Sequence, residues 1–459
     1  MTNQIKKVGV IGAGTMGAGI AGQVANAGVE VWLLDLPSDG ENVNSLAAKG
    51  LERLKDPDMP GLMSEEAEKL IKIGNTRDHF QELEDCDWIA EAVVERLDIK
   101  QSLYQRLNES CKEATIITSN TSTIPISLLT KGMPKKFCER FAITHFFNPV
   151  RFMRLLELVR GEFTRDDVIN TLDLFSETML GKGVVSCSDT PGFLANRVGV
   201  FAIQCALHKA FEYKLSPTEA DAFFGRPLGL PKTGVFGLYD LIGIDLMADV
   251  VKSLVSILPE NDVFHKYSSP IEIMTDMIAN GQTGNKNEKG FYKQVGDERQ
   301  VIDLSSGNYG VHERLKTPLL EEAEKIGISF IIKDTSIYGL YIWDVISETL
   351  CYAASLVPEV TDDLTQIDDA MKLGYNWVQG PFELLDEIGI EYFVDRLKVD
   401  GRDVPEFLLK GINNKFYNNS ESGLSSLSPD GNLKPIMRPD GVLRFSEVRQ
   451  TLKAINSNE

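Results

Sequence analysis

The sequence predicts a doubly wound α/β sheet at the N-terminus, followed by a region that contains an internal repeat. Three observations lead to this fold class. Apolar strand patterns alternate with helical patterns as far as residue 189, a glycine-rich segment joins the first strand pattern to the first helical one, and a twelve-residue pattern recurs in the second half. Alternating patterns of this kind are typical of a parallel sheet covered by helices. The length of 459 residues also exceeds what one core usually serves.

The composition is that of a globular protein, with 43% hydrophobic and 25% charged residues. No segment approaches the roughly 18 uninterrupted apolar residues that a membrane-spanning helix needs. The N-terminus passes from a short polar lead directly into a strand pattern, which leaves no room for a signal peptide. We therefore expect a cytoplasmic protein without membrane insertion.

The formal net charge of -20 argues against nucleic acid and anionic membranes as partners, because both favour basic surfaces. An acidic substrate would need a local basic site. The six cysteines form no CxxC pair, so neither a disulfide framework nor a zinc site is indicated, and we expect reduced thiols and no metal.

The segment KKVGVIGAGTMGAGIAGQVANAGVEVW contains the glycine-rich motif, with Gly12, Gly14 and Gly17 in the spacing GxGxxG between a strand and a helix. In a Rossmann-type unit the first glycine permits the tight turn, the second lets the backbone approach a pyrophosphate, and the third lets the helix pack closely. Asp35 ends the next strand pattern, where a carboxylate accepts hydrogen bonds from a ribose and repels a 2′-phosphate. The motif predicts NAD as cofactor. The alternative is a glycine-rich turn that binds nothing.

Further strands follow at regular intervals, and helical patterns separate several of them. In doubly wound sheets, ligands lie outside the carboxyl ends of the strands. Ser119–Ser122 and His145 fall at such ends, so we expect them to face the cofactor. The strands of this predicted parallel sheet, within a domain spanning residues 1–188, are Cys86–Glu95, Ala114–Asn120, Phe141–Phe147 and Gly183–Asp189.

His145 is one of five histidines and lies in the segment THFFNPVRFMRLLELV. A histidine that abstracts a hydroxyl proton works best beside a carboxylate, which fixes its tautomer and stabilises the imidazolium. Glu157 lies in an apolar segment that we expect to return as a strand after the turn at Asn148-Pro149, facing His145. The alternatives are a satisfied polar histidine and an ordinary exposed strand carboxylate.

These segments resemble the L-3-hydroxyacyl-CoA dehydrogenases of fatty-acid β-oxidation. The resemblance covers about residues 5–293 and rests on VGVIGAGTMGAGIA, AEAVVERLDIK, SNTS, HFFNPVRFMRLLELV, DTPGFLANR and GNKNEKGFY. It implies a Rossmann-type domain followed by an all-α dehydrogenase C-terminal domain, with the active site in the cleft between them.

The resemblance also implies roles for single residues. His145 would be the acid/base with Glu157 as its partner, and Ser122 and Asn196 would hold the substrate oxygen. The residues implied to contact NAD besides the glycine motif and Asp35 are Glu95, Lys100, Asn148 and Lys286. Without the resemblance, Ser122 is a turn or cap residue, Asn196 a polar helix start and Lys100 a solvated helix lysine.

The implied activity is the NAD-dependent oxidation of (S)-3-hydroxyacyl-CoA to 3-oxoacyl-CoA. The alternatives are reductive formation of 3-hydroxybutyryl-CoA, dehydrogenation of another hydroxy acid, and nucleotide binding without turnover. The partners expected are an acyl-CoA substrate and an enoyl-CoA hydratase or thiolase, in a monomer or dimer. Lys49, Arg53 and Lys55 are candidate CoA phosphate contacts, or simply a solvated helix face.

The second half repeats part of the first helical domain. GVFGLYDLIGID begins at residue 234 and GPFELLDEIGIE at residue 380, an offset of 146. We expect helical domains at 189–296 and 335–459, joined by a partly helical connector at 297–334. The resemblance implies that single-copy relatives dimerise through the helical domain, so we expect the second copy to cover that surface of the first within one chain. The second copy lacks a TPGFLANR segment, so we expect it to carry no site. The turns Pro429–Gly431 and Pro439–Gly441 predict a hairpin-like tail.

Overall fold

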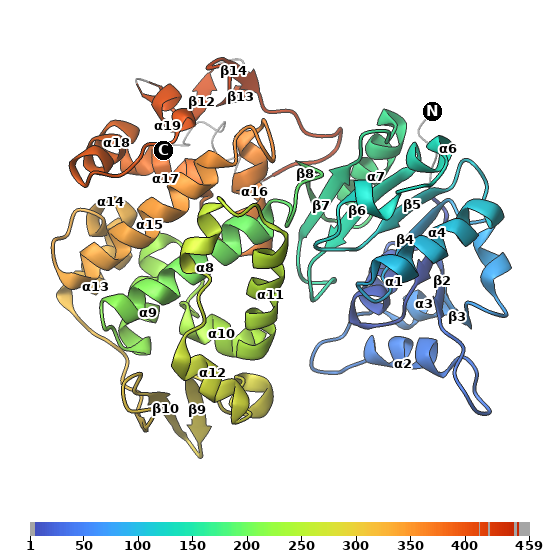
Figure 1. Ribbon diagram of the computed structural model, residues 1–459, viewed down its shortest axis with the longest axis horizontal. Helices are drawn as coiled ribbons and strands as arrows, with labels where there is room; N and C mark the ends of the chain where they lie inside the picture. The colour runs from blue at the N-terminus through green and yellow to red at the C-terminus, as the bar shows by residue number, and fades with distance from the viewer. Residues whose placement is uncertain (1–4, 413, 421–422, 445–447, 449–459) are drawn as a thin grey trace, which may run out of the picture. The chain divides into compact units, whose positions relative to one another are not determined.

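A computed structural model describes residues 5–412, 414–420, 423–444 and 448 (Figure 1). The chain divides into two compact units, one of residues 1–193 together with those from 437 onward, the other of Leu194–Ile436. The second unit thus contains both helical copies, and the tail after residue 436 belongs with the sheet domain.

The first unit is built on one eight-stranded sheet in the order β3-β2-β1-β4-β5-β6-β7-β8. The six strands from β3 to β6 run parallel, in the arrangement expected of a Rossmann-type domain. The strands are β1 (Lys7–Ile11), β2 (Glu30–Asp35), β3 (Ile71–Asn75), β4 (Trp88–Glu91), β5 (Ile116–Ser119), β6 (Phe141–Phe146), β7 (Leu155–Arg160) and β8 (Gly183–Ser188).

The prediction of a parallel sheet is wrong for β8, which pairs parallel to β7 and so runs opposite to the other predicted strands. The strand β7 runs antiparallel to β6, as expected of a strand that returns after the turn at Asn148-Pro149. The connection between β6 and β7 spans only residues 147–154, which is too short for the crossover that a parallel pair requires. The helix between β7 and β8 supplies such a crossover, so these two strands are parallel to each other.

Helices connect these strands and pack on the sheet through apolar side chains. Ile20, Ala21 and Val24 of α1 share a buried cluster with Val31 and Leu33 of β2. The helices of this unit are α1 (Thr15–Asn26), α2 (Ser45–Arg53), α3 (Glu65–Lys69), α4 (Leu97–Ser110), α5 (Ile126–Leu129), α6 (Lys135–Cys138) and α7 (Asp166–Thr178), with a 3₁₀ turn η1 (Phe80–Leu83).

The second unit contains the two helical copies and the connector. The first copy comprises α8 (Ala195–Glu212), α9 (Pro217–Phe223), η2 (Arg226–Leu228), α10 (Phe236–Ile242), α11 (Ile244–Ile257), η3 (Val263–Tyr267), α12 (Glu272–Ala279), η4 (Asn285–Asn287) and β9 (Tyr292–Val295). The connector supplies β10 (Glu298–Ile302), β11 (Tyr309–Val311), α13 (Pro318–Ile326) and α14 (Ile328–Ile331), so it is partly helical as expected. The second copy comprises α15 (Ile337–Ser355), α16 (Leu364–Gly374), α17 (Pro381–Ile388), α18 (Ile390–Val399), α19 (Glu406–Gly411), β12 (Tyr417–Ser420), β13 (Gly423–Leu427) and β14 (Leu433–Pro435).

The same hydrogen bonds recur in the two copies. Asp221 accepts from the backbone N–H of Phe236 and from the hydroxyl of Tyr292. Asp368 accepts from the corresponding groups, the N–H of Phe382 and the hydroxyl of Tyr417.

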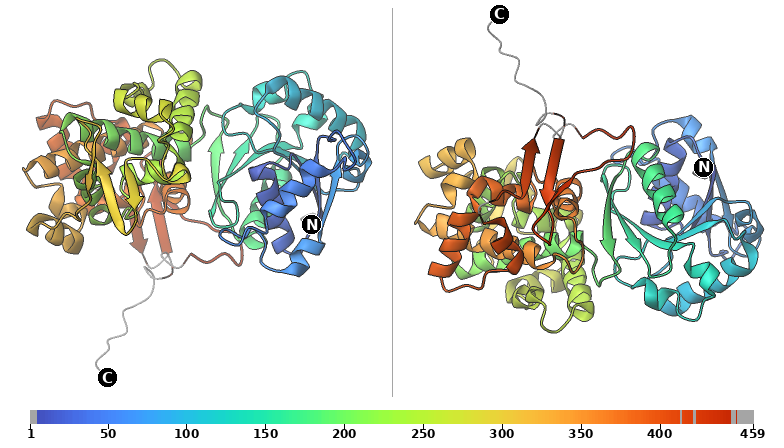
Figure 2. Two further views of the ribbon diagram at one scale, coloured as in Figure 1. Left: turned by 90° about the horizontal axis from the view of Figure 1, so that it is seen from below. Right: turned by 90° about the horizontal axis from the view of Figure 1, so that it is seen from above.

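A second carboxylate repeats in the same way. Asp240 accepts from the N–H groups of Phe291 and Tyr292, and Asp386 from those of Phe416 and Tyr417. These repeated contacts support the predicted duplication. A three-stranded antiparallel sheet follows the helices of each copy: β9-β10-β11, which extends into the connector, and β12-β13-β14. Figure 2 shows strands of the first sheet in yellow and of the second in red.

The tail prediction is confirmed at its first turn, since Pro429–Gly431 joins the antiparallel strands β13 and β14. The second turn, Pro439–Gly441, is followed by no strand within residues 442–444. All six cysteines are free, as expected. Among the described residues, no helix is long and apolar enough to cross a membrane.

Candidate active site

The glycine-rich loop between β1 and α1 has the geometry of a dinucleotide cradle. Gly12 has φ of +100°, and a Cβ there would lie 2.4 Å from the carbonyl oxygen of Ala92. A Cβ on Gly17 would lie 1.7 Å from the carbonyl oxygen of Gly12, whereas a Cβ on Gly14 would meet nothing within 4 Å. The fold itself therefore requires glycine at positions 12 and 17. Open space at position 14, beside the N-terminus of α1, fits the approach of a pyrophosphate.

Asp35 lies at the carboxyl end of β2 and connects this strand to the glycine-rich loop. Its carboxylate accepts hydrogen bonds from the backbone N–H of Ala13, at 2.6 Å, and of Leu36, at 2.7 Å. A carboxylate in this place repels a 2′-phosphate, so the residues present fit NAD better than NADP.

His145 and Glu157 occupy directly opposed positions on the antiparallel strands β6 and β7. Nδ1 of His145 lies 2.7 Å from Oε2 of Glu157, and the two residues are 7% and 0% exposed. The predicted contact is confirmed, and the alternative of an exposed strand carboxylate is wrong. Because opposed side chains of an antiparallel pair lie close together, the strand register alone brings the two groups into contact. With Nδ1–H donating to the carboxylate, Nε2 is left to exchange a proton with a substrate.

Phenylalanine rings flank the His145 imidazole. The rings of Phe147 and Phe193 have their centroids 4.5 and 5.9 Å from the imidazole centroid. Packing on these rings holds the imidazole orientation that the bond to Glu157 also requires.

The loop that carries Ser122 is tied to the strand that carries His145. Asn120 accepts a hydrogen bond from the backbone N–H of Phe146 through its side-chain oxygen, at 2.9 Å. Ser122 lies two residues further along this loop and is half-buried. Asn120 was missed as a positioning residue, although its place directly after β5, in the segment SNTS, was a usable signal. The loop at the end of β5 is thus held next to the end of β6.

A second buried carboxylate, Glu91 at the end of β4, was also missed. It accepts hydrogen bonds from Lys100 at 2.7 Å, from the hydroxyls of Tyr104 at 2.6 Å and Ser119 at 2.7 Å, and from the N–H of Val93 at 2.8 Å. A glutamate in the apolar strand WIAE was the available signal. Glu91 joins the ends of β4 and β5 to helix α4.

Lys100 is 1% exposed, so the alternative of a solvated helix lysine is wrong. Its ammonium pairs with Glu91 at 2.7 Å and with Glu95 at 3.2 Å. Glu95 has a side chain that is 39% exposed, and it also accepts hydrogen bonds from the hydroxyls of Thr121 and Thr123. This arrangement favours contact of a ligand with Glu95, with Lys100 holding that glutamate in place. The predicted direct contact of Lys100 with the cofactor has no support in this geometry.

Three further residues were predicted to lie at the site, one in the first unit and two in the second. Asn148 is exposed and precedes the cis peptide bond to Pro149 in the β6–β7 connection. Asn196, half-buried in the first turn of α8, belongs to the second unit. Lys286 belongs to that unit as well, and its ammonium pairs with Asp245 at 2.6 Å. Their roles at the site stay predictions.

The candidate CoA contacts lie on or beside α2. Lys55 pairs with Glu52 at 3.0 Å and with Glu68 at 2.7 Å. The guanidinium of Arg53 donates to the carbonyl oxygen of Ala13 in the glycine-rich loop, at 3.3 Å. Lys49 is exposed.

Two family models match the chain in consecutive order. The 3-hydroxyacyl-CoA dehydrogenase NAD binding domain matches residues 7–190, and the 3-hydroxyacyl-CoA dehydrogenase C-terminal domain matches residues 192–294. Together the two matches cover more than half of the sequence.

The chain belongs to the 3-hydroxyacyl-CoA dehydrogenase family.

Similar proteins agree with this assignment. A putative fatty acid oxidation complex trifunctional enzyme of Rickettsia prowazekii is 40% identical over 84% of this chain and 53% of its own length. A probable 3-hydroxyacyl-CoA dehydrogenase of Deinococcus radiodurans is 39% identical over 64% of this chain and 85% of its own length. The chain therefore spans about half the length of the first of these relatives.

Among solved structures, 3-hydroxybutyryl-CoA dehydrogenase from Escherichia coli aligns with a TM-score of 0.66 over 89% of this chain and 98% of its own. The identity is 24%, so this likeness concerns the fold alone. It extends well past residue 294, where the match to the second family model ends.

Proposed function

We propose that the protein oxidises (S)-3-hydroxyacyl-CoA to 3-oxoacyl-CoA with NAD as hydride acceptor, in fatty-acid β-oxidation. The observation that carries the proposal is the contact between His145 and Glu157, a histidine held by a buried carboxylate in a family of hydroxyacyl-CoA dehydrogenases. The geometry of Gly12, Gly14 and Gly17, with Asp35, supports NAD binding at the neighbouring strand ends.

His145 acts as the general base in this proposal. Nε2 accepts the proton of the substrate 3-hydroxyl, and the carboxylate of Glu157 stabilises the imidazolium that forms. In the reverse direction the imidazolium returns the proton to the ketone oxygen. When bound, NAD supplies the hydride acceptor for the substrate carbon. Ser122, on the loop that Asn120 holds beside β6, and Asn196 would donate hydrogen bonds to the reacting oxygen.

The test is NADH absorbance while acetoacetyl-CoA and then longer 3-oxoacyl-CoA substrates are mixed with the purified chain. We expect oxidation of NADH, much slower oxidation of NADPH, and rates that reveal the preferred chain length. Activity on acetoacetyl-CoA alone would favour the reductive 3-hydroxybutyryl-CoA reaction. Binding of NADH without its oxidation by any acyl-CoA would contradict the proposal.

We also propose that an enoyl-CoA hydratase or a thiolase works with this dehydrogenase. The trifunctional description of the Rickettsia relative, of which this chain spans 53%, supports further catalytic parts. The expected oligomeric states are a monomer or a dimer, which light scattering distinguishes, and cell fractionation tests the cytoplasmic location. Co-purification of neither enzyme activity with the native protein would contradict a stable complex.

A further inference from the structure

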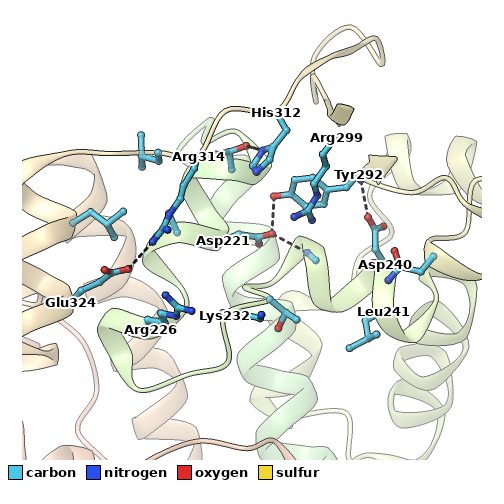
Figure 3. Close-up of a pocket in the computed structure, with 17 residues that line it drawn as sticks. Asp221, Arg226, Lys232, Asp240, Leu241, Tyr292, Arg299, His312, Arg314 and Glu324 are labelled. Carbon is cyan, nitrogen blue, oxygen red and sulfur yellow. Dashed lines mark hydrogen bonds and ion pairs between the residues drawn. The ribbon is translucent and has the colours of Figure 1, made fainter. Parts of the chain in front are cut away.

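The second unit contains a cavity of about 440 Å³ between the first helical copy and the connector (Figure 3). Its volume falls in the range of small-molecule sites, roughly 300 to 1,000 Å³. Thr218, Asp221 and Arg226 come from the first copy, while Arg299, His312 and Arg314 come from the connector. None of the residues predicted for the dehydrogenase site lines this cavity.

Four cationic side chains line the cavity, in a chain whose net charge is -20. Arg226 and Lys232 are exposed, and within the described part of the chain neither has a hydrogen-bond or ion-pair partner. Arg314 lies 3.9 Å from Glu324, and Arg299 lies over the Tyr292 ring at 4.1 Å. Figure 3 shows these cations on different sides of Asp221. Their donors remain available to an anion.

Two of the three carboxylates that line the cavity accept hydrogen bonds from neutral protein donors, and the third, Glu324, lies 3.9 Å from Arg314. Asp221 accepts from the N–H groups of Phe236 and Gly237 and from the hydroxyl of Tyr292, at 2.7 to 2.9 Å. Asp240 accepts from two further backbone N–H groups. Burial raises the pKa of Asp221 to about 7 and that of Asp240 to about 6, which lowers their negative charge near neutral pH. An entering anion thus meets the exposed side chains of Arg226 and Lys232, while Asp221 and Asp240 are held by protein donors.

The second copy provides an internal comparison, because it repeats this carboxylate frame with Asp368 and Asp386. Beside that frame, Lys372 pairs with Glu383 at 2.8 Å and with Asp369 at 3.4 Å. The lysine of the second copy is therefore neutralised within the protein. The repeated carboxylate contacts therefore form in the second copy beside a lysine that protein carboxylates already pair, whereas the first copy has the exposed Arg226 and Lys232 at this place.

We propose that this cavity binds a small molecule with two or more phosphate charges, of the size of a nucleoside diphosphate. Arginine guanidinium groups match phosphate oxygens through paired hydrogen bonds. The side chains of Tyr292, Leu241 and Leu315 provide apolar surface for an organic part. Such a ligand would contact both the connector and the first copy. Its binding would be a property of the chain separate from the proposed dehydrogenase reaction.

The test is calorimetric titration of ADP and of pyrophosphate into the full chain saturated with NADH, which blocks the glycine-rich loop. The variant is Arg226→Gln/Lys232→Gln. The control is Lys252→Gln/Lys434→Gln, which removes two exposed charges that do not line the cavity. We expect ADP binding that weakens at least tenfold in the first variant and stays unchanged in the control.

The outcomes separate the sources of the phosphate. ADP bound at least tenfold more tightly than pyrophosphate supports a nucleotide, while equal affinities support recognition of the phosphates alone. No binding of either probe, or equal weakening in the control, would overturn the proposal. Dehydrogenase activity, measured in parallel, is expected to persist in both variants, so this proposal and the proposed function fail independently.

Discussion

Two glutamates in the same sheet, Glu157 on β7 and Glu91 at the end of β4, are both fully buried and yet have different partners. Glu157 lies opposite the imidazole of His145, with Nδ1 and Oε2 2.7 Å apart. Glu91 accepts from an ammonium, two hydroxyls and a backbone N–H. The contact between His145 and Glu157 can support proton transfer to and from the imidazole. The four donors around Glu91 instead hold that side chain in one position. The partner, and not the burial, decides whether a carboxylate serves chemistry or structure.

Asp240 extends this comparison to a carboxylate with neutral donors only. It is 2% exposed and accepts from two backbone N–H groups. Burial raises its pKa to about 6, because these hydrogen bonds compensate only part of the lost solvation. The three carboxylates therefore differ in their partners: Glu157 faces an imidazole, Glu91 a buried ammonium, and Asp240 backbone N–H groups.

The largest expected effect comes from His145→Gln. Loss of the general base should reduce kcat by roughly 10² to 10⁴, while NAD affinity and the free energy of unfolding stay near those of the wild type. NADH absorbance and an NAD titration measure the first two quantities. His265→Gln, a histidine of the second unit that contacts the carbonyl of Pro259, is the matched control and should retain activity. A comparable loss of NAD affinity in His145→Gln would assign His145 a structural role.

Lys100→Met should be the most destabilising change, because it leaves Glu91 buried without its cation. Breaking a buried pair costs about 3 to 5 kcal/mol of unfolding free energy, measured by urea denaturation. Lys136→Met breaks the exposed pair with Glu113, in which the two side chains are 73% and 77% exposed, and should leave the free energy of unfolding nearly unchanged. Equal effects of the two variants would contradict the role assigned to the Glu91 cluster.

Glu157→Gln should have a smaller effect on turnover than loss of the histidine. Glutamine keeps the volume and can still accept the ring N–H, but it cannot balance the charge of an imidazolium. We expect kcat to fall by roughly tenfold to a hundredfold with KM little changed, since the carboxylate acts through the histidine. An unchanged kcat, measured by NADH absorbance, would show that the pair is only structural.

The smallest effect is a pH dependence from Asp240. Its pKa is raised from 3.8 to about 6 in the folded protein, so the folded state binds more protons than the unfolded state between these values. The stabilising contribution is complete below about pH 4 and is lost as the pH rises to about 6, with a slope of at most about 1.4 kcal/mol per pH unit. The difference in unfolding free energy between wild type and Asp240→Asn should follow this slope in urea titrations. A difference independent of pH would contradict it.

Much of the site could be predicted because its signals are local. The spacing of Gly12, Gly14 and Gly17, the polar residue after each apolar strand, and the return of the chain after Asn148-Pro149 all lie within short segments. The strand β3 (Ile71–Asn75) was not predicted, since only the first three residues of its short sequence IKIGN alternate between apolar and polar. Asn120 and Glu91 were missed for a different reason, because their hydrogen-bond partners come from other strands and helices.

The sequence by itself determined the Rossmann-type fold, the opposition of His145 and Glu157, and the repeat at an offset of 146 residues, because chain-local geometry and periodicity encode these features. Only the tertiary structure decided that Lys100 is buried, that Glu91 accepts from four donors, and that the side chains of Arg226 and Lys232 line a cavity with no hydrogen-bond or ion-pair partner among the described residues. A residue type specifies its charge and size, but its solvation and its partner depend on which distant segments pack beside it.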